Sequence, residues 1–231
     1  STRYKAAMDS AEQFLDKFVK SSSLGVSKIG YVAFNTDAHK IFGLQSCTNE
    51  TQAKKLKNTM RTETEKIINA TGYGDAHRRF TNIEAGLAMG QDMLKKEDNK
   101  HKFIIFLSDG FPTTYMSDTT NYLGYDPYDT TGRFYDHVLN KPCSNGTSYS
   151  DEAAIRAKKM AMKIKAENTT IFSIGVDIGG QTIQQYITQS EKEKGFSVVA
   201  APGQIMKSVM PQVQKHIKVG SETRLVPDTI T

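Results

Sequence analysis

A short apolar segment followed by an acid constrains the fold of this chain more than any other feature. Residues 103–107 read Phe-Ile-Ile-Phe-Leu, and the chain then becomes polar at Ser108-Asp109-Gly110. An apolar run without polar alternation is typical of a strand buried on both faces, as in a parallel sheet covered by helices. Ligands of such α/β domains bind beyond the carboxyl ends of the strands, so Asp109 is a candidate site residue. The alternative is an Asp-Gly turn that only closes the strand.

Helical and strand-like segments alternate along most of the 231 residues, which favours a single α/β domain. Residues 29–34 and 39–44 are strand-like and flank Asn35-Thr36-Asp37, so they predict an antiparallel hairpin. The expected fold is a doubly wound, mostly parallel sheet with one antiparallel edge strand and helices on both faces. Apolar spacing predicts helices near 3–20, 53–67, 83–94, 154–164 (capped by Ser150), 183–187 and 205–217, and further strands near 170–176 and 196–200.

Charge and hydropathy narrow the classes of partner. The net charge is +5, and the lysines are spread along many predicted helices, so they indicate solvated faces and no nucleic-acid partner is expected. No apolar run reaches the roughly 18 residues of a membrane span, so no membrane insertion is expected within this chain. Cys47 and Cys143 fall at opposite edges of the predicted sheet, so we expect them not to form a disulfide.

Thr81 is the second candidate site residue. It precedes the helix predicted at 83–94 and stands three residues before Glu84, which is the spacing of a capping box. A hydroxyl at the start of one helix and the carboxylate of Asp109 after the next strand are also expected at the same edge of the sheet. Hard cations such as Mg²⁺ take oxygen ligands of these two kinds.

These motifs resemble those of von Willebrand factor A (VWA) domains, which include integrin I domains and the tip adhesins of Gram-positive pili. In that family a metal-ion-dependent adhesion site takes its ligands from D-x-S-x-S after the first strand, a Thr before a helix, and an Asp after the fourth strand. The resemblance implies a Rossmann-like VWA fold with Thr81 and Asp109 as ligands of Mg²⁺ or Mn²⁺. Ile174-Gly175-Val176-Asp177 is similar to the fifth strand of the family.

The D-x-S-x-S motif itself has no counterpart, because no Asp in the chain is followed two positions later by Ser. We therefore expect the first strand of the family, with this motif, to lie upstream of Ser1. On this interpretation residues 1–218 form the VWA domain without its first strand, and residues 219–231 are a linker to a following module.

A long segment, residues 110–150, shows neither helical nor strand periodicity and holds six of the ten tyrosines. Loops of this length are uncommon in compact domains and are often functional. Tyrosine offers a large contact area at low entropic cost, which favours a recognition surface. The alternative is that the rings of the loop pack against one another. The ligand-binding residues predicted here are Tyr115, Tyr122, Tyr125 and Tyr128.

The resemblance implies a metal-dependent adhesion domain of a cell-surface or pilus protein. Its partner would be a host or extracellular-matrix protein, and its location the outside of a bacterial cell, on a pilus or the cell wall. The alternatives are metal-free binding of an extracellular target, an intracellular VWA scaffold in a multiprotein assembly, and a doubly wound hydrolase with Asp109 as nucleophile. The sequence has no Ser/His or Cys/His arrangement and no Gly-rich phosphate loop, so an enzyme is not expected.

Overall fold

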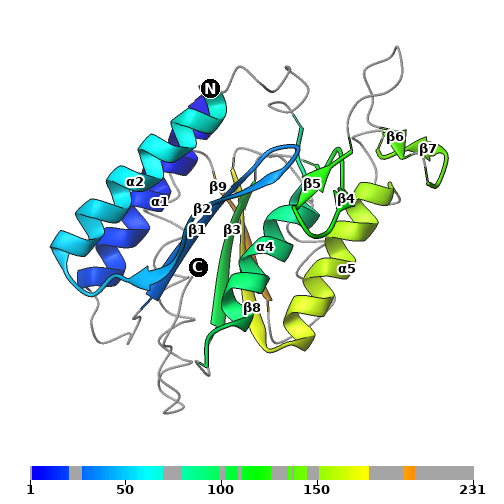
Figure 1. Ribbon diagram of the computed structural model, residues 1–231. Helices are drawn as coiled ribbons and strands as arrows, with labels where there is room; N and C mark the ends of the chain where they lie inside the picture. The colour runs from blue at the N-terminus through cyan, green and yellow to red at the C-terminus, as the bar shows by residue number, and fades with distance from the viewer. Residues whose placement is uncertain are drawn as a thin grey trace.

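A three-stranded parallel sheet lies at the centre of the protein, as seen in a computed structural model (Figure 1). Its strands are β3 (Lys102–Ser108), β8 (Thr169–Val176) and β9 (Gly195–Ala200), in the spatial order β3-β8-β9. The apolar run therefore forms the parallel strand that it predicts, with Phe103 opposite Thr170 in β8. The structure describes residues 2–20, 28–69, 80–98, 102–108, 111–125, 135–136, 138–144, 151–176 and 195–200.

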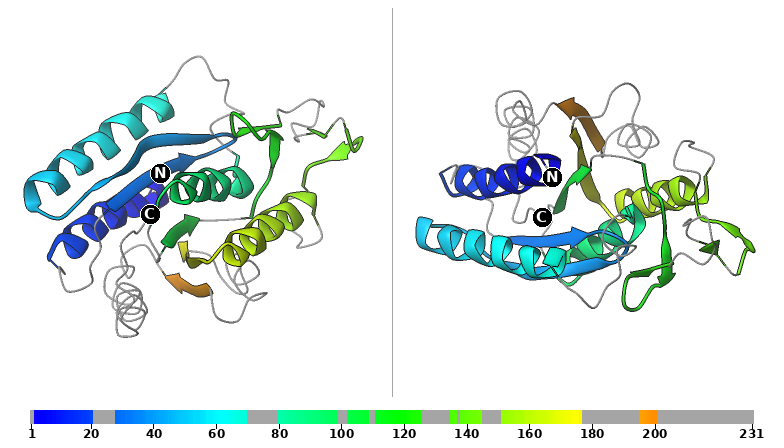
Figure 2. Two further views of the ribbon diagram at one scale, coloured as in Figure 1. Left: turned by 60° about the horizontal axis from the view of Figure 1, so that its bottom comes forward. Right: turned by 90° about the horizontal axis from the view of Figure 1, so that it is seen from above.

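The predicted hairpin is present and forms a sheet of its own. Strand β1 (Lys28–Phe34) pairs antiparallel with β2 (Ala38–Ser46). In both views of Figure 2, β3 lies between this hairpin and β8–β9. Phe34 of β1 stacks on Phe106 of β3, with ring centroids 5.9 Å apart, so the two sheets share one apolar core.

Four helices in the described part of the chain cover these sheets. Helix α4 (Ile83–Lys95) packs against β1, β2 and β3, and α5 (Glu152–Ala166) packs against α4 and β8. Ile83, Leu87 and Leu94 of α4 are fully buried at the spacing of a helical stripe, because they face both sheets and α5. These contacts confirm the predicted α/β fold class.

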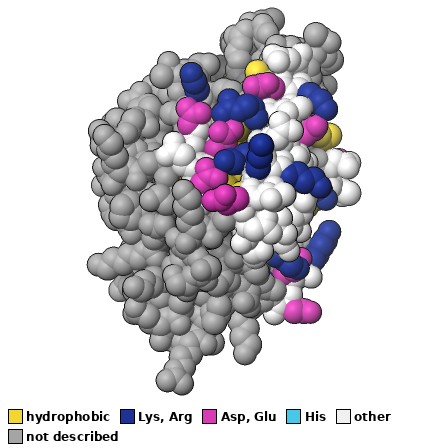
Figure 3. Space-filling view, turned by 90° about the vertical axis from the view of Figure 1, so that its left-hand side faces the viewer, with side chains coloured by type: hydrophobic (Ala, Val, Ile, Leu, Met, Phe, Trp, Pro, Cys, Tyr) yellow, Lys and Arg dark blue, Asp and Glu magenta, His cyan; other side chains and the backbone are white. Residues whose placement is uncertain are grey.

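Helices α1 (Thr2–Lys20) and α2 (Glu50–Asn69) pack together on the other side of the hairpin (Figure 1). Arg61 of α2 contacts Glu12 and Asp9 of α1 at 2.8 and 3.4 Å, and Lys57 contacts Asp16 at 2.8 Å. The surface of this side therefore mixes basic and acidic side chains, as Figure 3 shows. No helix among the described residues is long and apolar enough to cross a membrane.

The long segment after β3 differs from its prediction, because it contains two small hairpins. Strand β4 (Met116–Asp118) pairs with β5 (Leu123–Gly124), and β6 (Tyr135–Asp136) pairs with β7 (Lys141–Pro142). Strands of two or three residues are too short to produce a periodic pattern, so the sequence did not reveal them.

The start of α5 is also corrected. Its N-cap is Asp151 rather than Ser150, and the Asp151 carboxylate accepts a hydrogen bond from Ser144 Oγ at 3.0 Å instead of capping a helix amide. Several predicted features lie outside the described residues. They are Ser150, the helices near 183–187 and 205–217, and the linker at 219–231.

Candidate functional site

The backbone of Thr81 is fixed against the segment that follows β3. Its carbonyl accepts hydrogen bonds from the amides of Thr113 (2.9 Å) and Thr114 (3.4 Å), and its amide donates to Thr113 Oγ1 at 2.9 Å. The side chain of Thr81 is half-buried, and its hydroxyl makes no hydrogen bond to any residue that the structure describes. The backbone of Thr81 is therefore held in place by the segment that follows β3.

Asp109, the second predicted metal ligand, lies outside the described residues. The neighbouring chain is described on both sides: β3 ends at Ser108, and Thr113 meets Thr81 five residues later. The approach of the Asp109 carboxylate to the Thr81 hydroxyl stays a prediction. Among the residues that are described, no group of three or more His, Cys, Asp or Glu side chains is arranged to hold a metal ion.

The capping box predicted for Thr81 and Glu84 is wrong. The N-cap of α4 is Asn82, whose Oδ1 accepts from the amide of Ala85 at 3.0 Å. Glu84 turns away from the helix start and accepts from the amide of Met116 at 2.9 Å, so it holds the first small hairpin to α4. Burial raises the pKa of the Glu84 carboxyl, and the Met116 hydrogen bond opposes this rise. Because Asn82 caps α4, the Thr81 hydroxyl takes no part in the hydrogen bonds at the start of this helix.

The turn of the β1–β2 hairpin is joined to both sides of this site. Asn82 donates from its amide to the carbonyl of Asn35 at 2.8 Å and from Nδ2 to the carbonyl of Thr36 at 2.9 Å. The amide of Gly124 donates to Asp37 Oδ1 at 2.8 Å. Figure 1 shows the turn beside β5 accordingly. The sequence predicted Asn35, Thr36 and Asp37 only as the turn of the hairpin, and it predicted no role for Asn82 or Gly124.

The four tyrosines predicted to contact a ligand differ in their surroundings. Tyr115 is 0% exposed and donates a hydrogen bond to Asp136, so its ring has no surface to offer a partner and supports the alternative of internal packing. Tyr125 meets Tyr115 edge to face at 5.4 Å between ring centroids and is half-buried. Tyr122 is half-buried and donates to Asp92, and burial followed by this hydrogen bond raises its pKa to about 12. Ligand contact by Tyr122 and Tyr125 stays a prediction, and Tyr128 lies outside the described residues.

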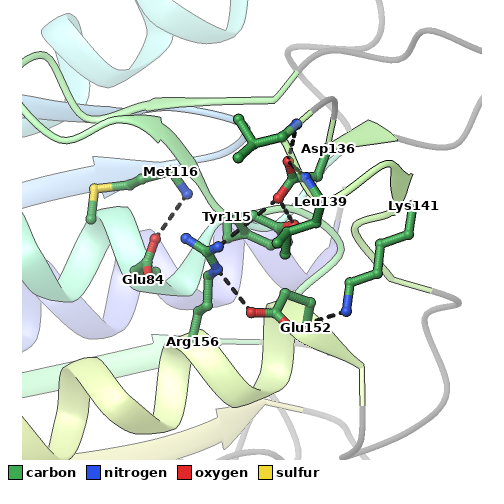
Figure 4. A network of polar contacts seen from close by, with 9 residues as sticks. Glu84, Tyr115, Met116, Asp136, Leu139, Lys141, Glu152 and Arg156 are labelled. Atoms are coloured by element: carbon green, nitrogen blue, oxygen red, sulfur yellow. Dashed lines mark hydrogen bonds and ion pairs between the residues drawn. The ribbon is translucent and has the colours of Figure 1, made fainter.

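A polar network extends from the buried Tyr115 to α5 and becomes partly exposed at Arg156 and Lys141 (Figure 4). The Arg156 guanidinium lies 4.2 Å from the centroid of the Tyr115 ring and 3.9 Å from Asp136 Oδ2. Arg156 Nε also contacts Glu152 at 3.1 Å, and Glu152 contacts Lys141 of β7 at 3.2 Å. Burial alone raises the pKa of the Asp136 carboxyl. Hydrogen bonds from Tyr115, Leu139 and Val138, with the charge of Arg156, outweigh burial and lower this pKa.

The two cysteines are free and buried. Cys143 lies beside Tyr115 and Ala153 in a small cluster, and burial raises the pKa of its thiol to about 11. It is therefore a protonated packing residue at neutral pH and not a nucleophile.

The side-chain oxygen of Thr81 is of a type that fits a hard divalent cation. A threonine hydroxyl and a carboxylate are the ligand types that Mg²⁺ and Mn²⁺ take, usually together with water. Thr81 could supply the hydroxyl ligand, because its backbone is fixed and its side-chain oxygen makes no hydrogen bond within the described part of the chain. Of the residues in this sequence, Thr81 and Asp109 would hold the ion.

Comparisons with known proteins agree with this fold. Residues 6–207 match the family described as "Rv0959-like protein, vWA domain". No curated protein matches the chain. The vWF domain of the type V pili tip protein Mfa5 from Porphyromonas gingivalis superposes with a TM-score of 0.60 at 16% identity, covering 95% of this chain and 89% of that one.

Two further structures are similar over nearly the whole chain. The pilus adhesin SpaC from Lactobacillus rhamnosus GG gives a TM-score of 0.60 at 15% identity, covering 94% of this chain and 28% of SpaC. Proximal thread matrix protein 1 from the mussel byssus, in a structure with a zinc-occupied MIDAS motif, gives a TM-score of 0.52 at 16% identity. The match covers 94% of this chain and 43% of the mussel protein. The chain thus spans less than half of either protein. Because the family match covers most of its length and the fold agrees, the chain belongs to the Rv0959-like vWA domain family.

Proposed function

We propose that this domain is a non-enzymatic protein-binding module that holds a divalent cation at a metal-ion-dependent adhesion site. Thr81 and Asp109 are ligands of the ion, Mg²⁺ or Mn²⁺, which when bound offers an open coordination position to a carboxylate of the partner. The observation that carries the proposal is the fixed Thr81 backbone with a hydroxyl that makes no hydrogen bond to the described residues. The zinc-occupied MIDAS of the mussel protein is further support for a metal at this position of the fold.

The partner we propose is a host or extracellular-matrix protein, and the location is the cell surface, on a bacterial pilus or the cell wall. Support comes from Mfa5 and SpaC, which are named as a pilus tip protein and a pilus adhesin. The remaining ligands would come from a D-x-S-x-S segment on a strand that precedes Ser1, and Tyr122, Tyr125 and Tyr128 would contact the partner beside the ion.

Isothermal titration with Mg²⁺ and with Mn²⁺ tests the metal site directly. The wild-type domain should bind both ions, and Thr81→Ala should weaken binding at least about tenfold because one of few oxygen ligands is lost. Asp109→Ala should abolish binding, since it removes a charged ligand. Matched controls are Thr120→Ala and Asp98→Ala, two exposed residues of the same types away from Thr81. Equal affinities in the wild type and both site variants would refute the assignment.

A further inference from the structure

Thr81 and Thr113 are joined by hydrogen bonds in both directions. The amide of Thr81 donates to Thr113 Oγ1 at 2.9 Å, and the carbonyl of Thr81 accepts from the amide of Thr113, also at 2.9 Å. A single hydrogen bond lets two residues rotate about it, whereas two bonds between the same pair fix their relative orientation. One of the two bonds depends on the Thr113 hydroxyl, so this contact is specific to the side chain at position 113.

Thr113 belongs to the segment that carries the other proposed metal ligand. It stands four residues after Asp109 and five residues after Ser108, where β3 ends. The buried Pro112 precedes it and restricts the backbone, because the proline ring fixes φ at about −65°. The pair therefore ties the loop before α4 to the segment after β3, across 32 positions of the sequence.

The residues that follow Thr113 hold its backbone in place. Thr114 is fully buried, and its Oγ1 donates to the carbonyl of Tyr125 at 3.3 Å. Two positions further along, the amide of Met116 donates to Glu84 of α4 at 2.9 Å. A supporting side chain keeps a ligand in position only when the support is itself fixed, and these contacts meet that condition for Thr113.

We propose that Thr113 is a positioning residue of the candidate metal site, and that its hydroxyl holds Thr81 where Thr81 binds the divalent cation. The inference rests on the proposed function and adds to it a residue that does not touch the ion. Hydrogen-bond partners of ligating residues set the orientation of the ligands, and their loss costs about 10–100-fold in metal affinity. The alternative is that the Thr113 hydroxyl only stabilises the loop.

Four substitutions separate these two roles. Thr113→Val keeps the shape of the side chain but removes its oxygen, and Thr113→Ala removes the oxygen without placing a methyl group against the Thr81 amide. Thr113→Ser keeps the oxygen and should rescue the site. Thr114→Val is the matched control, because it removes the hydrogen bond to Tyr125 and leaves the contact between Thr113 and Thr81 in place. Urea unfolding ranks the stabilities of all four variants.

Hydrogen exchange of the Thr81 amide, followed by NMR in EDTA, tests the contact without any metal. Thr113→Val and Thr113→Ala should each speed the exchange of this amide about fivefold, because its acceptor is lost. Thr113→Ser should exchange as the wild type does, and Thr114→Val should have a smaller effect than the two oxygen-free variants. Wild-type exchange rates in both oxygen-free variants would overturn the proposal.

Isothermal titration with Mg²⁺ measures the consequence for the site. Thr113→Val and Thr113→Ala should bind the ion at least about tenfold more weakly than the wild type, whereas Thr113→Ser and Thr114→Val should retain the wild-type affinity. Equal losses of affinity in Thr113→Val and Thr114→Val would overturn the proposal and leave the Thr113 hydroxyl with a purely stabilising role.

The titration also separates this inference from the proposed function. Wild-type affinity in both oxygen-free variants, together with weak binding by Thr81→Ala, would overturn the role of Thr113 and uphold the metal site. Wild-type affinity in Thr81→Ala, or no binding of Mg²⁺ by the wild-type chain, would overturn the metal site and this inference with it.

Discussion

Gly124 occupies a position where a side chain cannot be accommodated. A Cβ atom there would lie 2.2 Å from the carbonyl oxygen of Thr36, which is backbone and cannot move aside cheaply. We expect Gly124→Ala to destabilise the domain by about 1–3 kcal/mol through overpacking, measured by urea unfolding. Gly43→Ala is the control, since nothing lies within 4 Å of its added Cβ, and its effect should stay within about 1 kcal/mol. Equal effects of the two substitutions would contradict this account.

Asn82 is expected to stabilise the Thr81 loop in two ways. Asn82→Ala removes the cap of α4, worth about 0.5–2 kcal/mol, and removes the hydrogen bond to the carbonyl of Thr36, at about 0.5–1.5 kcal/mol. Asn49→Ala is a matched control, because Asn49 accepts from the amide of Gln52 at 2.9 Å at the start of α2 and is exposed.

Urea unfolding should therefore show a larger loss of unfolding free energy for Asn82→Ala than for Asn49→Ala. The difference measures the contact with the hairpin turn. If both variants lose the same amount, Asn82 is only a helix cap and does not tie the turn to Thr81.

At this scale the sequence identified residue types more reliably than their partners. Thr81 was predicted at the start of a helix and lies there, but the cap is its neighbour Asn82. The local sequence allows either Thr81 or Asn82 to be the N-cap of α4. The choice is made by Asn35 and Thr36, which contact Asn82 from 46 or more positions away in the sequence. Similarly, Tyr115 carried the features of a recognition residue, and only the packing of Asp136 and Arg156 around it reveals that it is buried.

At the scale of elements, the contact between Tyr115 and Asp136 joins the segment after β3 to the β6–β7 hairpin. Hydrogen bonds and Arg156 lower the pKa of the Asp136 carboxyl in the folded state despite its burial. A carboxyl with a lowered folded pKa contributes stability that is present above its unfolded pKa of about 4 and is lost as the pH falls through the folded value. The domain should therefore lose unfolding free energy on acidification below about pH 4.

Tyr115→Phe tests this contribution. It should lower the unfolding free energy at neutral pH by about 1–3 kcal/mol, because the buried Asp136 oxygen loses a donor. It should also reduce the loss on acidification, since the folded pKa of Asp136 moves back toward its ordinary value. Tyr135→Phe is the control, as its hydroxyl bonds the exposed Asn140. Identical pH profiles for the wild type and Tyr115→Phe would disprove the linkage.

Long periodic elements were predicted well, because their patterns are local. Helices α1, α2, α4 and α5 and strands β1, β2, β3, β8 and β9 all lie where apolar spacing predicts them, within a few residues. The β4–β5 and β6–β7 hairpins were missed because their strands have two or three residues each. They are held by the side chains of Asp37, Glu84 and Arg156, which belong to other elements.

At the scale of the whole molecule, the β1–β2 sheet and the β3-β8-β9 sheet share α4 and a core, and no strand pairing joins them among the residues that the structure describes. Helix α4 packs against β1, β2 and β3, so the two sheets are joined through its buried face.

The joining of the β1–β2 turn to Gly124 has a consequence for how the domain folds. The hydrogen bond from Gly124 to Asp37 links residues 87 positions apart, and the bond from Met116 to Glu84 links residues 32 apart. Closing such long loops costs entropy before any contact repays it, which slows folding. During synthesis, the surroundings of Thr81 can assemble only after the ribosome has released more than half of the chain, whereas α1, the β1–β2 hairpin and α2 can form earlier.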